Sequence, residues 1–271
     1  MHVYGSAKSS LKGFRVIGNA VFNNGCLHAP GRFTWSILVG GGAPVEDAIV
    51  AENMTLNAGI QLGYGWGAQN KDLTARRNYT FGMTLCFQDR IICEENTIIG
   101  GRPVLRVIQK EGGSLDNHRI DRNLYHNTEP RYYPFHVTFG KKGRSINADD
   151  WKKKGFDANS ELREGLPKGA KVFVRPNKYE PGRANILIYN WDKAPSVPVD
   201  LKGVLKEGQR FRVVNARNFY GATVASGTYQ GTPVSIPMSA MTPAQPSGMP
   251  DYKLPVTEPL FGAFVVLRGS D

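Results

Sequence analysis

The chain has 271 residues, of which 41% are hydrophobic and 21% are charged, a balance typical of a folded globular protein and not of a disordered one. No apolar run is long enough to span a bilayer, so we expect no membrane partner. The 34 Lys and Arg residues outnumber the 23 Asp and Glu residues. The resulting net charge of +11 favours an anionic partner, although charge can also serve solubility alone.

A short phrase recurs along the first half of the chain, in which an Asn stands between a charged or small residue and a run of alternating apolar residues. Successive Asn residues are 34, 25, 18 and 27 positions apart, which is about one turn of a solenoid with loops of variable length. We interpret this Asn as structural, because a stacked amide can hydrogen-bond to the coils above and below it. Asn also tolerates the left-handed backbone of a sharp corner. The five residues are Asn19, Asn53, Asn78, Asn96 and Asn123.

A second set of short apolar strands accompanies the Asn phrases. Their period-2 alternation, with no helix pattern between them, excludes architectures that alternate strands and helices. We therefore predict an all-β fold in which residues 1–165 form a short parallel β-helix of about five to six coils. Leu38, Leu62 and Leu85 are expected to point inward as an apolar ladder, since no single coil can bury its own face. These strands are predicted at 36–40, 59–63, 83–87, 104–108 and 135–139.

Residues 149–157 predict a short closing helix with acidic residues in its first turn, basic residues in its last turn and a Gly stop. Trp151 and Phe156 are the candidates for covering the last apolar layer, because a solenoid needs a cap. Beyond a linker at 166–169, short strands separated by turn signals predict a small antiparallel β-sandwich over residues 166–271. The strands are predicted at 171–175, 185–191, 197–201, 210–215, 223–229, 233–237 and 260–268.

The patterns of Cys and acidic residues predict no metal-binding site. Cys26, Cys86 and Cys93 form an odd set without Cys-x-x-Cys, which argues against a disulfide framework and a zinc site. Calcium prefers six or more oxygen ligands, and no run of the type Asp-x-Asp-x-Asp offers them. We therefore expect no cofactor. We also expect no nucleic-acid partner, because no recognition motif accompanies the positive charge.

The coils, the closing segment from Trp151 to Ser160 and the C-terminal module resemble bacterial right-handed parallel β-helix proteins of the pectate-lyase-like superfamily. The resemblance covers nearly the whole chain and implies a secreted or periplasmic protein with a polysaccharide along its stacked strands. The superfamily contains lyases, hydrolases, epimerases and phage adhesins, so the fold does not select an activity. Such proteins usually begin with a capping element, whereas this chain enters a repeat by Phe14. We expect either a piece of a longer solenoid or end-to-end self-association through an uncapped first coil.

Cleavage of an acidic polysaccharide by β-elimination is the first chemistry that the residues suggest. A lyase removes the proton next to a uronate carboxylate, which requires a cation to stabilise the enolate and a base to take the proton. Arg106 is the candidate cation, because it alternates with Leu105 and Val107 and is predicted to point outward. Lys110 or His136 is the candidate base. A solvated Arg106 and a structural His136 remain the alternatives.

Two further functions stay open, a glycoside hydrolase and a non-catalytic glycan-binding module or remnant of a larger enzyme. Hydrolysis requires two carboxylates that face each other across the scissile bond, and Asp89 and Glu111 form the best pair. Exposed aromatic rings would offer stacking platforms for sugars, and Gly-flanked loop positions favour such exposure. Candidate substrate-binding residues are Tyr64, Trp66, Gln88, Arg90 and His118, with a further platform at Arg131, Tyr132 and Tyr133.

Overall fold

The computed structural model describes residues 1–6, 9–24, 34–64, 68–239, 241–248 and 254–269. Contacts divide the chain into two compact units, Met1–Leu166 and Pro167–Asp271. Strands dominate both units, so the predicted all-β class is confirmed. The helices in the described residues are α1 (Ala148–Lys153) and the 3-10 helix η1 (Ala216–Asn218), and neither is long and apolar enough to cross a bilayer.

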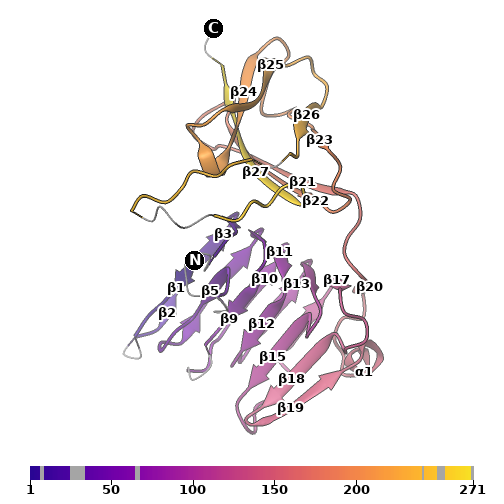
Figure 1. The fold of residues 1–271 in the computed structure, drawn as a ribbon. Helices are drawn as coiled ribbons and strands as arrows, with labels where there is room; N and C mark the ends of the chain where they lie inside the picture. The colour runs from indigo at the N-terminus through magenta and orange to yellow at the C-terminus, as the bar shows by residue number, and fades with distance from the viewer. Residues whose placement is uncertain (7–8, 25–33, 65–67, 240, 249–253, 270–271) are drawn as a thin grey trace. The chain divides into compact units, whose positions relative to one another are not determined.

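In the described part of residues 1–166, three sheets are built almost entirely from parallel strands (Figure 1). The chain passes through the three sheets in turn, so each strand pairs with the strands of the preceding and following passes. The sequence predicted two strands in each pass, and the structure has a third, which ends two residues before the Asn. The short apolar segments of this third strand run into the charged residues of the corner, so no separate apolar run marks it in the sequence.

The first sheet consists of β1 (His2–Val3), β5 (Ile37–Val39), β9 (Ile60–Leu62), β12 (Met83–Cys86), β15 (Leu105–Gln109), β18 (Phe135–Phe139) and β19 (Lys142–Ile146), with β19 antiparallel to β18. The second consists of β3 (Arg15–Ile17), β7 (Ile49–Ala51), β10 (Leu73–Arg76), β13 (Ile91–Glu94) and β16 (His118–Asp121). The third consists of β4 (Ala20–Val21), β8 (Met54–Thr55), β11 (Tyr79–Phe81), β14 (Thr97–Gly100), β17 (Leu124–Asn127) and β20 (Glu161–Glu164). A short parallel ladder joins β2 (Leu11–Lys12) and β6 (Val45–Glu46).

Register in the first sheet separates an inward apolar row from an outward polar row. Leu62 and Leu85 are register partners and fully buried, as predicted. The prediction for Leu38 is wrong, because Leu38 pairs with Gln61 and is only half-buried, whereas Val39 occupies the inward position next to Leu62. Side chains alternate with a period of two, so an error of one residue moves a side chain to the opposite face.

A buried ladder of Asn side chains joins successive passes, as the repeated phrase predicted. Asn78 Oδ1 accepts hydrogen bonds from the backbone N–H and the Nδ2 of Asn53, each at 3.0 Å. Asn78 Nδ2 donates to Asn96 Oδ1 at 2.9 Å. The left-handed residue at each corner is not the Asn but the residue before it, which directs the Asn side chain into the stack. These preceding residues have φ between 52° and 73° and are Gly18, Glu52, Arg77, Glu95 and Arg122.

The closing helix α1 covers part of the last apolar layer, as predicted. Trp151 is fully buried, its ring stacks on that of Phe135 with centroids 4.9 Å apart, and it lies 4.7 Å from the ring of Phe156. The buried carboxylate of Asp157 accepts a hydrogen bond from Trp151 Nε1 at 2.7 Å. This bond satisfies the indole N–H and positions the ring on the end of the core.

The described part of residues 167–271 contains two antiparallel sheets that share one apolar core, as a sandwich requires. Core residues come from both sheets, for example Ile188 and Phe264 from one and Val199 and Ile236 from the other. The larger sheet consists of β21 (Ala170–Pro176), β22 (Ala184–Asn190), β27 (Phe261–Arg268), β24 (Arg210–Asn215) and β25 (Thr223–Thr228), and the smaller of β23 (Ser196–Val199) and β26 (Val234–Pro237).

The Asn ladder makes a quantitative prediction for stability. Asn78→Ala leaves two buried donors of Asn53 without their acceptor, and each unpaired donor costs about 1–3 kcal/mol. We expect the free energy of unfolding of residues 1–166 to fall by roughly 2–5 kcal/mol, measured by denaturant unfolding. Asn19→Ala is the matched control, because Asn19 is only half-buried and donates at the end of the ladder. If both variants lost the same free energy of unfolding, the buried hydrogen bonds of Asn78 would not be stabilising the stack.

A buried ion pair makes a second prediction, for residues 167–271. Both carboxylate oxygens of Glu258 accept from Arg217 Nη2, at 2.7 and 2.6 Å, and the two side chains are almost completely buried. Glu258→Gln should lower the free energy of unfolding by about 3–5 kcal/mol, because it leaves a buried guanidinium without its counter-charge. The double variant Arg217→Met with Glu258→Leu should recover most of that loss. If Glu258→Gln is as stable as the natural chain, the Arg217 guanidinium does not need the charge of Glu258.

Candidate functional site

The outward row of the first sheet places Arg106 beside His136. Arg106 is exposed between the buried side chains of Leu105 and Val107, as predicted. Its register partner on β18 is His136, and the partner of His136 on β19 is Ser145. Residues opposite one another on adjacent strands project from the same face. The parallel pairing of passes therefore brings together two residues that lie 30 positions apart in the sequence.

Two loops that lead into the first sheet add a cluster of Arg and Tyr side chains. The guanidinium carbon of Arg102 lies 3.9 Å above the centroid of the Tyr132 ring, and that of Arg131 lies 5.0 Å from the same centroid. Arg102 Nη2 also donates a hydrogen bond to the Tyr132 hydroxyl. Glu129 Oε2 pairs with Arg102 at 2.9 Å and with Arg131 at 3.6 Å. The carboxylate and the ring together hold the two guanidinium groups close to each other.

The second loop is anchored by a buried amide. Asn127, at the end of β17, donates from Nδ2 to the carbonyl of Tyr132 at 3.1 Å and accepts from the backbone N–H of Glu129 at 3.2 Å. Gly101 in the first loop lies against this segment, since a Cβ at that position would meet the side chain of Glu129 at 2.8 Å. The geometry of both loops is therefore set by the end of the third sheet.

These elements enclose an open cleft of about 420 Å³ on the outer face of the first sheet. Its lining contains three Arg residues and no carboxylate. Glu129 offsets one of the three positive charges, so the cleft keeps a net positive charge. Arg106 has no ion pair among the described residues, and its guanidinium is free for an anionic ligand. Tyr133 is half-exposed at the rim and offers a ring face. The cleft is lined by Arg102, Pro103, Arg106, Arg131, Tyr132, Tyr133, His136 and Ser145.

The surroundings of His136 favour the neutral form of its imidazole. Partial burial lowers the pKa of its imidazole below the usual value, and the positive charge of Arg106 lowers that pKa further. Ser145 Oγ lies 3.2 Å from Nδ1 and orients the ring. On the other side of the ring, Gly143 presents no side chain, and a Cβ there would lie 2.8 Å from Nε2. A neutral imidazole beside an Arg can accept a proton from a carbon acid whose negative charge the Arg stabilises.

The other predicted catalytic residues do not line this cleft. Lys110 follows the end of β15, where its Nζ lies 5.9 Å from the centroid of the Phe87 ring. Glu111 lies against Gly140 in the turn between β18 and β19, where a Cβ on Gly140 would be 2.9 Å from the Glu111 Cβ. Asp89 is exposed in the segment between β12 and β13, where its backbone N–H donates to the carbonyl of Asn70. The structure brings Arg106 and His136 together and does not add Asp89 or Glu111 to them.

The predicted substrate-binding residues are dispersed. Gln88 is fully buried and donates to the carbonyls of Leu62 and Cys86, so contact with a polysaccharide does not fit its position. Arg90 is exposed and pairs with Asp72. Tyr64 is exposed directly after β9. His118 lines a different cavity, and Trp66 lies outside the described residues.

Sequence reasoning missed Arg102 and Ser145 and placed the platform at 131–133 without connecting it to Arg106. The available signal was the pattern of loop positions, because residues 101–104 and 128–134 each lie between a strand of the third sheet and a strand of the first. Aligning the passes strand by strand would have placed the two loops next to each other. The described residues contain no cluster of three or more His, Cys, Asp or Glu side chains that could hold a metal ion.

Comparisons with protein-family models, with curated proteins and with solved structures give no match for this chain. The geometry of the site therefore carries the functional argument.

The contact between Arg106 and His136 predicts a measurable pKa change. Arg106→Gln removes the neighbouring positive charge, so the pKa of His136 should rise, while the effect of burial persists. The measurement is an NMR titration of the imidazole Cε1–H resonance. Arg119→Gln is the control. Arg119 lies on β16 of the second sheet, so this substitution removes one positive charge from a different sheet and should leave the pKa of His136 unchanged. A His136 pKa that stays the same or falls in the Arg106 variant would contradict the placement of the two groups.

Proposed function

We propose that the protein binds an acidic polysaccharide in the cleft on the outer face of the first sheet and cleaves it by β-elimination. The observation that carries the proposal is the juxtaposition of Arg106, a cation without an ion pair among the described residues, with His136, whose imidazole pKa is lowered by burial and by Arg106. Arg102 and Arg131 extend the cationic surface from one side. Tyr133 supplies an aromatic face on which a sugar ring can stack.

The proposed reaction uses the two central residues in different roles. Arg106 pairs with the carboxylate of a uronate residue and stabilises the enolate that forms when the neighbouring C–H bond breaks. His136 Nε2 takes that proton. The electron pair then forms a carbon–carbon double bond as the bond to the leaving glycosidic oxygen breaks, and the leaving oxygen takes a proton from water. The imidazolium returns its proton to solvent, so no water is added to the sugar.

The fold-level part of the proposal is that residues 1–166 form a right-handed parallel β-helix of the pectate-lyase-like type. Three stacked parallel sheets and the rotation of the chain through them support it. We further propose that the protein is secreted or periplasmic, because polymeric acidic sugars of this kind occur outside the cytoplasm. End-to-end association through the first strands is a separate proposal, supported by exposed Ile17 in the edge strand β3 and exposed Phe14 directly before it.

A non-catalytic glycan-binding module is the second candidate, because the cationic and aromatic lining of the same cleft is sufficient for binding. Hydrolysis receives less support. Neither Asp89 nor Glu111 lines the cleft, and paired carboxylates are what a glycoside hydrolase needs.

The test is an assay on a panel of pectin, alginate, glycosaminoglycan and neutral glycans. Elimination produces an unsaturated sugar that absorbs in the ultraviolet, hydrolysis produces reducing ends without that absorbance, and a binding module produces neither. On the substrate that is cleaved, Arg106→Ala should lower kcat/KM by roughly 100-fold or more, the scale observed when one oxyanion-stabilising group is removed. His136→Ala should lower kcat by about 100-fold to 10,000-fold, with less effect on binding.

Arg119→Gln is the control for the loss of one positive charge away from the cleft and should leave the rate unchanged. If Arg106→Ala leaves elimination unchanged, the site assignment is wrong. If no polymer is cleaved but Arg106→Ala weakens binding of an acidic polymer, the protein is a binding module. If no acidic polymer binds at all, both the lyase and the binding-module proposals are wrong.

A further inference from the structure

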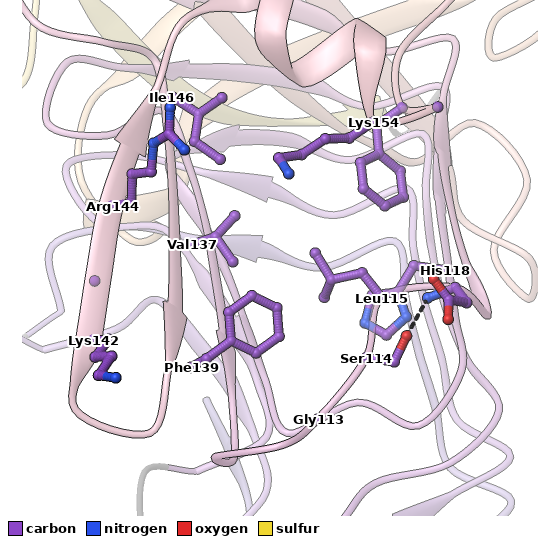
Figure 2. A pocket seen from close by; sticks show the side chains of 14 residues that line it. Gly113, Ser114, Leu115, His118, Val137, Phe139, Lys142, Arg144, Ile146 and Lys154 are labelled. Atoms are coloured by element: carbon purple, nitrogen blue, oxygen red, sulfur yellow. Dashed lines mark hydrogen bonds between the residues drawn. The ribbon is translucent and has the colours of Figure 1, made fainter.

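A second and larger cavity, of about 920 Å³, lies on the opposite side of the β18–β19 hairpin from the Arg106 cleft. Register places Ser145 and His136 on one face of the hairpin and Arg144 and Val137 on the other. The first pair lines the cleft described above, and the second lines this cavity. Figure 2 shows Val137 and Phe139 projecting from the hairpin toward Leu115, which comes from the loop on the other side.

The cavity exists because the cap covers only part of the last apolar layer. Trp151 stacks on Phe135, at the start of β18. Val137 and Phe139, further along the same strand, pack against the apolar core and also line the open space. Phe156 lines it from the cap. The result is a floor of aliphatic and aromatic side chains at the end of the stack.

Cations surround this apolar floor. Lys142 and Arg144 come from β19 and Lys154 from the end of α1, and none of the three forms an ion pair with a described residue. Figure 2 shows Lys154 extending over the cavity toward Arg144 and Ile146. One carboxylate, that of Asp116, lies among the lining residues. Three unpaired cations against one carboxylate favour a negatively charged occupant.

A buried polar atom without a partner lies in the same wall. His118 is 8% exposed, and its Nε2 lies 3.1 Å from Gln109 Nε2. An amide N–H can only donate, so the ring accepts at Nε2 and carries its own proton at Nδ1. Nδ1 has no hydrogen-bond partner among the described residues. Burial lowers the pKa of this imidazole to about 4, so the ring is neutral at physiological pH and adds no positive charge to the cavity wall.

We propose that this cavity binds an amphipathic carboxylate, such as a medium-chain fatty acid. The apolar body lies against Leu115, Val137 and Phe139, and the carboxylate is held by Arg144 and Lys154. A polysaccharide lacks the continuous apolar body that this floor would bury, and a small inorganic anion would leave the floor empty. The site is separate from the Arg106 cleft and does not depend on the function proposed for that cleft.

The test is isothermal titration calorimetry of the full chain with decanoate, with decanol and acetate as comparison ligands. We expect one molecule of decanoate per chain, and at least tenfold weaker binding of both decanol and acetate. Lys154→Ala and Arg144→Ala should each weaken decanoate binding about tenfold, which corresponds to about 1.4 kcal/mol. Trp151 contacts Phe156 in the cavity wall, so a change in tryptophan fluorescence on binding provides a second readout.

Lys152→Ala is the matched control, because Lys152 lies on the same helix, is exposed and does not line the cavity. It should bind decanoate as the natural chain does, and so should Arg106→Ala. The proposal is overturned if decanoate does not bind, if Lys154→Ala and Arg144→Ala bind as tightly as the control, or if decanol or acetate binds equally well. Loss of decanoate binding in Arg106→Ala would move the ligand to the other cleft and would also overturn it.

Discussion

The parallel register between successive passes of the chain is the constraint on which the rest of residues 1–166 depends. Each strand of a pass hydrogen-bonds to the strands before and after it, so apolar residues stack inward while the residues between them stack outward. The inward stack forms one continuous core from Val39 to Val137. The outward stack brings Arg106 and His136 together. Core and candidate site are therefore two faces of one pairing pattern.

The Asn ladder explains how loops of very different length can join regular passes. Each buried amide satisfies donors of the pass before it and depends on the pass after it for its own acceptor. A left-handed residue immediately before the Asn turns the chain into the corner. Because the corners are held by these hydrogen bonds between passes, the other loops of a pass are free to vary in length. Two of those loops carry the Arg and Tyr side chains of the cationic cleft.

The two cavities differ in whether their cations have ion-pair partners and in whether the cavity floor is polar or apolar. In the outer cleft, Glu129 pairs with Arg102 and Arg131, and the floor is a polar row of the sheet. In the cavity at the end of the stack, Lys154 and its neighbours have no such partner among the described residues, and the floor is apolar. A polar cationic cleft suits a hydrated, charged polymer. An apolar floor with cations at its edge suits a ligand that loses water along most of its length.

The sequence by itself determined the all-β class, the parallel stacking with its Asn ladder, the closing helix and the outward direction of Arg106, because each follows from a local pattern. Period-2 alternation sets a strand and its faces, and a repeated phrase sets a repeated corner. Local patterns were insufficient for Leu38, where a shift of one residue reversed the face, and for Gln88, whose burial depends on neighbouring passes. Only the tertiary structure decided that Arg106 lies opposite His136 and shares a cleft with Tyr133, that Asp89 and Glu111 lie elsewhere, and that part of the last core layer stays open. The physical reason is that these outcomes depend on contacts between passes, and variable loop lengths make the distance along the chain a poor guide to distance in space.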